Sequence, residues 1–394
     1  MKKGILAIFA VFAAMTAAKA QKSERANVIC GPYVQCVTST GFTVVWTTDV
    51  DAVAWVEVAP DDGTHFYNRE REKYYDSRGN GVLPIGRIHK IEVDGLEPGT
   101  NYRYRIMSKG VISYDGPGKV EYMKVRGTDV YRGKPYMIST FKNDYDTLRF
   151  NMYNDIHAAD SLLNVLMKGT QNNPDFVFLN GDMTSDITRH EMISDMYLNT
   201  VAKNLKGAVP LFASRGNHEL RGKDAVRWFD YFQTPTGTPY YSFSIGKYFF
   251  VVLDACEDKP DSDIEYCGIV ASEQYLKRQE KWLKEALNSE ECRNAEVRIA
   301  FCHIPPELKA WHGNRQLCQR LVPALNQAGI DAMLCGHIHK WRVEEAHETL
   351  SNADFPVICN PNLHRMEVTV TDKRIEIKSY NTNGVLHHSH SIDL

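Results

Sequence analysis

The stretch of sequence that decides the fold is Val209-Pro210-Leu211-Phe212-Ala213-Ser214-Arg215-Gly216-Asn217-His218-Glu219. Its first half, residues 209–213, is a short apolar run that predicts a buried β-strand. The chain then switches at once to Gly216, which permits a tight turn, and to Asn217 and His218, whose side chains are potential metal ligands. Ligands of open α/β sheets bind beyond the carboxyl ends of the strands, so this stretch predicts a ligand site at a sheet edge.

Four other predicted strands run into residues of the same kind. These strands are residues 148–153, 175–179, 297–301 and 330–334. The segments that follow them are Asn154-Asp155-Ile156-His157, Asn180-Gly181-Asp182, Cys302-His303 and Cys335-Gly336-His337-Ile338-His339. Because all five segments come at strand ends, we expect them to converge on one edge of the fold.

The second half of the chain alternates apolar strands with helical stretches. Further strands are predicted at 248–253, 366–370 and 375–379, and a helix at 272–287 places Leu276 and Leu283 on one apolar face. This alternation predicts an α/β layered domain over residues 145–394.

Residues 27–144 follow a different pattern, with short alternating segments separated by turn residues. Residues 42–47 and 101–106 are examples, and a last strand is predicted at 136–141 after an insertion over 112–134. This pattern is typical of a β-sandwich.

The first twenty residues, 1–20, are typical of a secretory signal peptide. Lys2 and Lys3 form a basic start, residues 5–14 are apolar, and Ala18-Lys19-Ala20 is a small-residue ending. A retained membrane anchor is the alternative, but about ten apolar residues are too few for a bilayer core of ~30 Å. We therefore predict a secreted or periplasmic protein that begins near Gln21 and has no transmembrane segment.

The composition describes a soluble globular protein of two domains, with 394 residues, 43% hydrophobic and 24% charged. Loss of Lys2, Lys3 and Lys19 with the signal peptide would move the formal net charge from −3 to −6. The sequence shows no cluster of basic residues of the kind found in nucleic-acid-binding proteins, so no nucleic-acid-binding surface is expected. The oligomeric state is left open.

The chain contains nine cysteines, an odd number, so at least one is unpaired unless it pairs between chains. Cys30 with Cys36, and Cys256 with Cys267, are close enough in sequence to be bridged in an oxidising compartment. Cys302 lies in an apolar run and is expected to be a buried thiol, as is Cys335.

The donor types in the five segments indicate the class of metal. Carboxylate, amide oxygen and imidazole together suit borderline divalent ions and iron(III), whereas a soft site would need thiolates. A structural zinc site is the alternative, but such sites are closed and usually have four ligands, whereas this set is larger. A lone Asp-x-His or Gly-Asp is most often a turn, and only the full set favours a metal site.

The set of five motifs resembles the calcineurin-like metallophosphoesterase superfamily, over essentially all of residues 147–380. The resemblance implies an αββα layered domain with two metal ions (iron, zinc or manganese) per chain. Asp155, His157 and His339 would bind the first metal and Asp182 would bridge; Asn217, His303 and His337 would bind the second. His218 would be the catalytic histidine that meets the phosphate and leaving group, and Glu219 would orient either His218 or a metal ligand.

The N-terminal half resembles a fibronectin type III domain, especially the one that precedes the catalytic domain in purple acid phosphatases. Trp46 and the segment Gly95-Leu96-Glu97-Pro98-Gly99-Thr100-Asn101-Tyr102 carry this resemblance. The metal motifs depart from those enzymes at two positions. Ser185 stands where they have an iron-binding tyrosine, and this chain has His157 where they lack a histidine, so the number of ligands is preserved.

The resemblance implies hydrolysis of small phosphate esters by attack of a metal-bound hydroxide, with phosphomonoesters favoured. The alternatives are a phosphodiesterase acting on nucleotides or phospholipids, and a catalytically inactive binding protein of the same fold. The natural substrate and the metal pair are left open.

Three weaker candidates lie outside the motifs. His312 and Arg315 follow the His303 segment and are candidate substrate contacts, although an exposed loop without a role is the simpler interpretation. Residues 256–270, rich in Asp and Glu, are either a rim of the site or a solvated acidic loop. His387, His388 and His390 are expected to be solvated.

Overall fold

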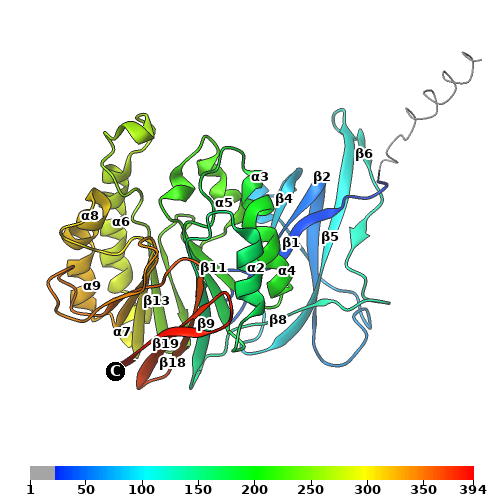
Figure 1. Cartoon of the computed structure of the whole chain (residues 1–394). Coiled ribbons are helices and arrows are strands. Elements are labelled where there is room, and N and C mark those ends of the chain that lie inside the picture. The colour runs from blue at the N-terminus through cyan, green and yellow to red at the C-terminus, as the bar shows by residue number, and fades with distance from the viewer. Residues whose placement is uncertain (1–22) are drawn as a thin grey trace, which may run out of the picture.

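A β-rich domain and a layered α/β domain lie side by side in the computed structural model, which describes residues 23–394 (Figure 1). This arrangement confirms the predicted fold class. The predicted signal peptide lies outside the described residues, and the limits 27–144 and 145–394 of the two domains stay a prediction. Within the described part of the chain, no helix combines the length and apolar character needed to cross a membrane.

The β-rich domain is organised around one very long strand, β2 (Phe42–Pro60). The first half of β2 pairs with β1 (Val28–Gln35) and β4 (Gly86–Val93), and its second half pairs with β5 (Asn101–Tyr114). The short strands are β3 (Lys73–Tyr75), β6 (Val120–Tyr122), β7 (Arg126–Gly127) and β8 (Tyr136–Ser139), and η1 (Ser77–Gly79) is a single turn. The strand predicted at 136–141 is therefore present, and the predicted insertion contains two short strands.

Trp46 lies at the centre of this domain and is fully buried. Its indole Nε1–H donates to Ser108 Oγ at 3.0 Å, so the polar end of a large apolar side chain is satisfied inside the core. Because Trp46 lies on β2 and Ser108 on β5, this hydrogen bond links these two strands through their side chains.

Two six-stranded sheets form the centre of the α/β domain. The first has the order β11-β10-β9-β18-β19-β20 and the second β12-β13-β14-β15-β17-β16. The strands of the first sheet are β9 (Leu148–Tyr153), β10 (Phe176–Asn180), β11 (Leu211–Ser214), β18 (His364–Val370), β19 (Arg374–Asn381) and β20 (Leu386–Asp393). Those of the second are β12 (Tyr241–Ile245), β13 (Tyr248–Leu253), β14 (Val297–Cys302), β15 (Ala332–Cys335), β16 (Arg342–Glu344) and β17 (Val357–Cys359).

Helices cover the outer faces of the two sheets (Figure 1). The first sheet is covered by α2 (Asp160–Lys168), by the continuous stretch of α3 (Glu191–Ile193), η2 (Ser194–Leu198) and α4 (Asn199–Leu205), and by α5 (Trp228–Tyr231) with η4 (Ala225–Arg227). The second sheet is covered by α6 (Ser272–Leu287), α7 (Glu290–Asn294), α8 (His312–Arg320) and α9 (Val322–Ala328). The helix predicted at 272–287 is confirmed with both of its limits.

Aromatic side chains fill the space between the two sheets. Phe178 on β10 stacks on Phe301 of β14 with ring centroids 3.9 Å apart, and Phe150 packs edge-on against Phe250. Every residue of β10 and β13 is buried, as expected for strands covered on both faces. This apolar core fixes the sheets relative to each other, and with them the loops at their ends.

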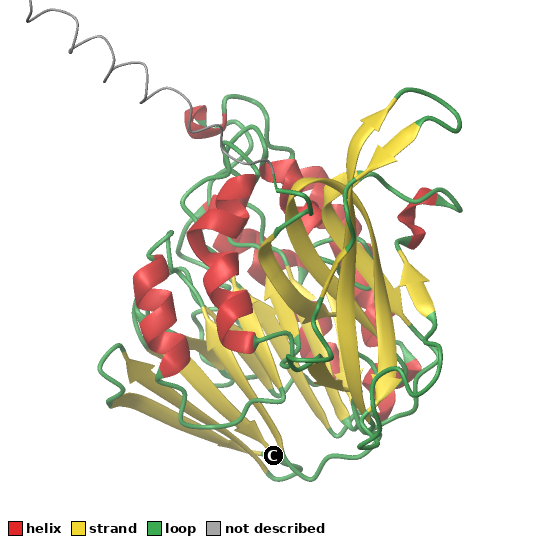
Figure 2. Cartoon of the chain, turned by 90° about the vertical axis from the view of Figure 1, so that its right-hand side faces the viewer, coloured by secondary structure: helices red, strands yellow, loops and turns green. Residues whose placement is uncertain are grey.

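The β-rich domain packs on the helical layer beside the first sheet (Figure 2). Two buried tyrosines of the β-rich domain donate to backbone carbonyls of the α/β domain. Tyr104 Oη donates to Gly207 O at 2.8 Å, and Tyr33 Oη donates to Tyr231 O at 2.7 Å. The interface is therefore a specific, hydrogen-bonded one.

All nine cysteines are free thiols, so neither Cys30 with Cys36 nor Cys256 with Cys267 is bridged. Cys30 lies on β1 and Cys36 directly follows it, and six residues of extended chain span roughly 20 Å, far beyond the reach of a disulfide. The Cys267 thiol contacts the carbonyl of Ile264 at 3.5 Å, whereas Cys256 is buried. Cys302 and Cys335 are fully buried, as predicted.

Candidate metal centre

The five predicted segments meet where the carboxyl ends of parallel strands from both sheets come together. Three of them follow β9, β10 and β11 of the first sheet, and two follow β14 and β15 of the second. The structure thus brings together six of the side chains that the sequence proposed as metal ligands: Asp155, His157, Asp182, His303, His337 and His339. The seventh, Asn217, directly precedes His218, whose backbone N–H donates to Asp182 Oδ1.

The first group of side chains is Asp155, His157 and His339, whose ligand atoms all lie within 4.8 Å of one another. Asp155 Oδ1 is 3.1 Å from His339 Nε2, and the two histidine Nε2 atoms are 3.2 Å apart. Asp155 Oδ2 accepts hydrogen bonds from Asn154 Nδ2 and from the His337 backbone, which leaves Oδ1 directed at the imidazoles.

The second group is Asp182, His303 and His337, again with ligand atoms within 4.8 Å of one another. Asp182 Oδ2 lies 3.0 Å from His303 Nε2. His303 Nε2 is also 3.8 Å from Asp155 Oδ1, so the two groups are adjacent. Asp182 further forms a group with His157 and His218, which places its carboxylate between the two sets.

Two buried polar atoms at this centre make no hydrogen bond of good geometry among the described residues. They are Asn217 Oδ1 and His303 Nε2, and the latter faces only the carboxylate oxygen Asp182 Oδ2, at 3.0 Å. The opposite ring nitrogen of His303, Nδ1, donates to the carbonyl of Asn180 at 2.7 Å, so Nε2 is the nitrogen that faces the centre. Leaving a buried polar atom without a partner costs free energy, and a metal ion is a partner that suits both atoms. The donor set therefore fits metal ions.

The electrostatics of the centre favour cations. Burial alone would lower the pKa of His303, but the carboxylates of Asp182 and Asp155 outweigh it and raise the pKa to about 10. Burial likewise opposes ionisation of Asp182, yet the neighbouring His303 and His218 hold its pKa below the usual range. Buried carboxylates that stay ionised need positive charge beside them, which metal ions supply.

The backbone of the centre is held in an uncommon conformation. Five of the seven side chains belong to residues with positive φ: Asp155 (52°), His157 (47°), Asp182 (52°), His337 (68°) and His339 (54°). Residues other than glycine adopt such angles at a cost, and clusters of them are characteristic of functional sites. The positive φ angles are therefore a further indication that these strand-end loops form a functional site.

Comparison with known protein families agrees with this geometry. The model for calcineurin-like phosphoesterases matches residues 148–341, which contain all seven side chains. Residues 148–341 form a calcineurin-like phosphoesterase domain. The chain is thus a metal-dependent phosphoester hydrolase, and its β-rich half matches the N-terminal domain of purple acid phosphatases over residues 30–118.

Individual relatives are distant. Purple acid phosphatase 23 of Arabidopsis thaliana is 23% identical over 359 residues, which cover 77% of this chain and 72% of the plant protein. Serine/threonine-protein phosphatase CPPED1 of Mus musculus is 28% identical over 195 residues, covering 47% of this chain and only 58% of the mouse protein. The match to CPPED1 thus spans little more than half of that protein's length.

Solved structures show the same fold. The purple acid phosphatase PPD1 from yellow lupin seeds superposes with a TM-score of 0.64 at 13% identity, covering 92% of this chain and 74% of the lupin chain. PhoD superposes with a TM-score of 0.56 at 14% identity, covering 89% of this chain and 87% of its own. Both domains of this phosphoesterase are therefore arranged as in known structures.

His218 lies beside the candidate metal ligands of this phosphoesterase, half-buried at the start of η3 (His218–Leu220). Its Nδ1–H donates to the carbonyl of Ser185 at 2.8 Å, and its Nε2 lies 3.9 Å from Asp182 Oδ2. Ser185 thus orients this ring through its backbone carbonyl. The backbone N–H of His218 donates to Asp182 Oδ1 at 3.0 Å.

The carboxylate of Glu219 is hydrogen-bonded to the loop that carries Asp182, and among the described residues it makes no hydrogen bond to the His218 ring. Its buried carboxylate accepts four backbone N–H groups, from Asp182, Met183, Thr184 and Gly216, at 2.7–3.3 Å. A carboxylate with this many donors clamps the loops after β10 and β11 together. Glu219 therefore orients Asp182 through the backbone.

Arg221 is a functional candidate that the sequence reasoning missed. Its guanidinium lies 3.4 Å from His218 Nε2 and forms ion pairs at 3.1 Å with Glu257 and Glu265. Both acids belong to the stretch 256–270, so that stretch is attached to the site through Arg221. In the sequence, Arg221 is only a single charged residue two positions after Glu219. No spacing rule separates such a residue from an ordinary surface arginine.

The predicted substrate contacts His312 and Arg315 stay a prediction. His312 is the first residue of helix α8 and does not lie in a loop, because α8 begins directly after Trp311. The helix packs against the acidic stretch, where the Gly313 N–H donates to Asp258 O at 2.9 Å. Arg315 is exposed, and its guanidinium donates to Ala310 O at 3.5 Å.

Proposed function

We propose that this chain is an exported phosphoesterase with a dinuclear metal centre, which hydrolyses small phosphate esters and favours phosphomonoesters. One observation carries the proposal: six candidate ligand side chains fall into adjacent groups whose ligand atoms lie within 4.8 Å of one another, and the buried Asn217 Oδ1 beside them has no hydrogen-bond partner among the described residues. A closed structural site would use four ligands and would not need this number.

We assign Asp155, His157 and His339 to one metal ion and Asn217, His303 and His337 to the other, with Asp182 as the bridge. The bridging role is supported by the position of Asp182, whose ligand atom lies within 4.8 Å of ligand atoms from both sets. Two bound ions would acidify a water nucleophile and neutralise the charge on the phosphate oxygens. Iron, zinc and manganese all suit this donor set.

The role of the chain's own residues follows from their orientation. His218 is held by Ser185 so that Nε2 faces the centre, where it can donate a proton to the departing alkoxide. Arg221 donates toward the same Nε2 in the present arrangement. Protonation of Nε2 would end that contact and free the Arg221 guanidinium for a phosphate oxygen, a group that it binds well.

Export is proposed from the N-terminal segment, whose basic start, apolar run and small-residue ending have the order of a signal peptide. Purple acid phosphatase-like domain order and the absence of a membrane-spanning helix among residues 23–394 are compatible with it.

The substrate class is tested by comparing 4-nitrophenyl phosphate with bis(4-nitrophenyl) phosphate, nucleotides and a phospholipid, on protein refilled with each metal in turn. We expect kcat/KM for the monoester to exceed that for the diester by at least about tenfold, a difference of ~1.4 kcal/mol in transition-state binding. A preference for the diester would support the phosphodiesterase alternative. No turnover of any ester by metal-loaded protein would support the inactive binding protein.

The expected difference from purple acid phosphatases, with Ser185 in place of their tyrosine and His157 as an additional ligand, gives a prediction about colour. Violet colour in those enzymes comes from charge transfer between a phenolate and iron(III), and Ser185 has no aromatic ring to donate. The iron-loaded protein is therefore expected to lack a violet band. His157→Gly should weaken the first metal position, since it removes one of four assigned ligands, and adding Ser185→Tyr should restore metal binding and create the band.

Visible absorption and iron content of the three proteins measure this outcome. A violet band in the unmodified protein, or full metal occupancy in His157→Gly, would contradict the assignment of the first metal. His347→Gly is the matched control, because His347 is exposed and its imidazole pairs only with Asp354.

A further inference from the structure

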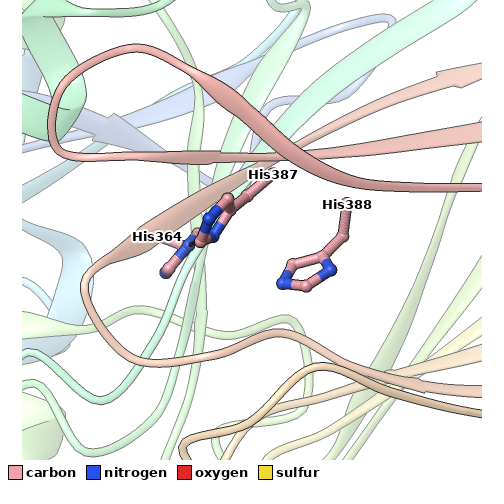
Figure 3. Close-up of side chains that lie close together, drawn as sticks. All are labelled: His364, His387 and His388. Atoms are coloured by element: carbon pink, nitrogen blue, oxygen red, sulfur yellow. Dashed lines mark hydrogen bonds between the residues drawn. The ribbon is translucent and has the colours of Figure 1, made fainter.

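Three histidines from two strands of the first sheet come together, and none of them belongs to the groups of candidate ligands described above (Figure 3). His364 is the first residue of β18, and His387 and His388 are consecutive residues of β20. Their ligand nitrogens all lie within 4.8 Å of one another. The sequence pattern suggested only a solvated cluster of His387, His388 and His390, and it did not include His364.

A β-bulge directs two neighbouring side chains toward the same place. Consecutive residues of a regular strand point to opposite faces of the sheet, so His387 and His388 should diverge. In β20, however, His388 pairs with Ser379 and Leu386 pairs with Tyr380, which leaves His387 as an extra residue between two adjacent partners. A bulge of this kind re-aims a side chain, and here it brings two imidazoles together.

The hydrogen bonds of His364 fix which nitrogen faces the cluster. Its Nδ1 lies 2.9 Å from the carbonyl of Asn362, and a carbonyl can only accept, so Nδ1 carries the proton. The lone pair is therefore on Nε2, which faces His387 Nδ1 at 3.2 Å. A backbone carbonyl that orients an imidazole in this way is a common support for metal-binding histidines.

His388 is held by an aromatic contact. Its ring stacks on the indole of Trp341 with centroids 5.0 Å apart and planes 4° from parallel. Trp341 follows the metal ligand His339 by two residues, so the cluster is joined to a loop of the metal centre. His390, by contrast, faces Glu345 at 3.8 Å and lies outside the cluster.

We propose that His364, His387 and His388 bind one divalent transition-metal ion, with zinc as the expected occupant, at a site separate from the dinuclear centre. Three neutral imidazoles suit zinc, copper(II) and nickel, and leave a position for water or an anion. Zinc–nitrogen bonds of about 2.0–2.1 Å place neighbouring ligand nitrogens roughly 3.3 Å apart in a tetrahedral site. The 3.2 Å between His364 Nε2 and His387 Nδ1 agrees with that spacing.

The competing interpretation is a plain hydrogen bond, in which His387 Nδ1–H donates to His364 Nε2. Metal content separates the two interpretations. The full chain, its His387→Ala and His364→Ala variants, and the control His390→Ala are equilibrated with micromolar zinc, freed of unbound metal and analysed for zinc. We expect His387→Ala and His364→Ala each to contain one zinc ion per chain fewer than the unmodified protein, and His390→Ala to lose none.

A second readout uses the stacked tryptophan. Copper(II) bound at His388 should quench the fluorescence of Trp341, and this part of the quenching should be lost in His387→Ala and in Trp341→Phe. Both readouts are differences between the variants and the unmodified protein. Ions bound at the dinuclear centre contribute equally to each protein and therefore cancel. Unchanged zinc content in both His364→Ala and His387→Ala, with circular dichroism like that of the unmodified protein, would leave only the hydrogen bond and overturn the proposal.

Discussion

Asp182→Asn is expected to remove both metal ions from the dinuclear centre and to lower turnover by a factor on the order of 10³ or more. Asp182 is the one carboxylate assigned to both ions, and its Oδ2 lies 3.0 Å from His303 Nε2. A neutral amide bridges two cations poorly, and it also removes the charge that raises the pKa of His303. Metal analysis and hydrolysis of 4-nitrophenyl phosphate measure the effect.

Asp186→Asn is the matched control, since it makes the same change four residues further along the same loop, outside every group of candidate ligands. It should retain both ions and near-normal turnover. If Asp182→Asn also retained two tightly bound ions and normal turnover, the bridging assignment would be wrong.

His218→Ala is expected to retain both metals and most of the affinity for substrate, but to lower the turnover number by about 10²–10⁴. The hydrogen bond from this residue to Asp182 Oδ1 comes from the backbone, so alanine keeps it. What alanine removes is the ring that Ser185 directs at the centre. The loss should shrink for a 4-nitrophenyl ester, whose leaving group needs no proton, and be largest for an alkyl ester.

His218→Ala also distinguishes two readings of the geometry, because the ligand atoms of His157, Asp182 and His218 form a group of their own. Loss of a metal ion from His218→Ala would make His218 a ligand and would require a different division of the site. His347→Ala, at an exposed histidine, should change neither metal content nor turnover.

Much of the catalytic domain could be predicted from sequence because its strands are continuous apolar runs covered on both faces. Residues 148–153 and 248–253 are the limits of β9 and β13 in the structure. The centre could be predicted for a related reason: the ligand residues follow those strands directly, and parallel strands present their carboxyl ends at one edge. Local sequence therefore contained most of the information about the site.

Arg221 and the histidine cluster could not be predicted because both depend on contacts between distant segments. Arg221 is placed by ion pairs with Glu257 and Glu265, more than thirty residues away. The cluster depends on the register of β20 against β19, in which a single extra residue decides the direction of His387. Register is set by tertiary packing, and short polar strands specify it weakly in sequence.

The cysteines illustrate a limit of sequence distance. Cys30 and Cys36 are close in sequence, but an extended strand separates them far more than a turn or helix would. Proximity along the chain predicts a bridge only when the intervening conformation is known.

The most direct test of the central claim is turnover measured against the number of bound ions. The His387→Ala variant is used so that the proposed zinc cluster adds nothing to the count. The protein is stripped with a chelator, refilled stepwise with one metal, and assayed with 4-nitrophenyl phosphate at each step. The dinuclear account predicts no turnover without metal and full turnover only as occupancy approaches two ions per chain. Full turnover in the stripped protein, or at one ion per chain, would contradict it.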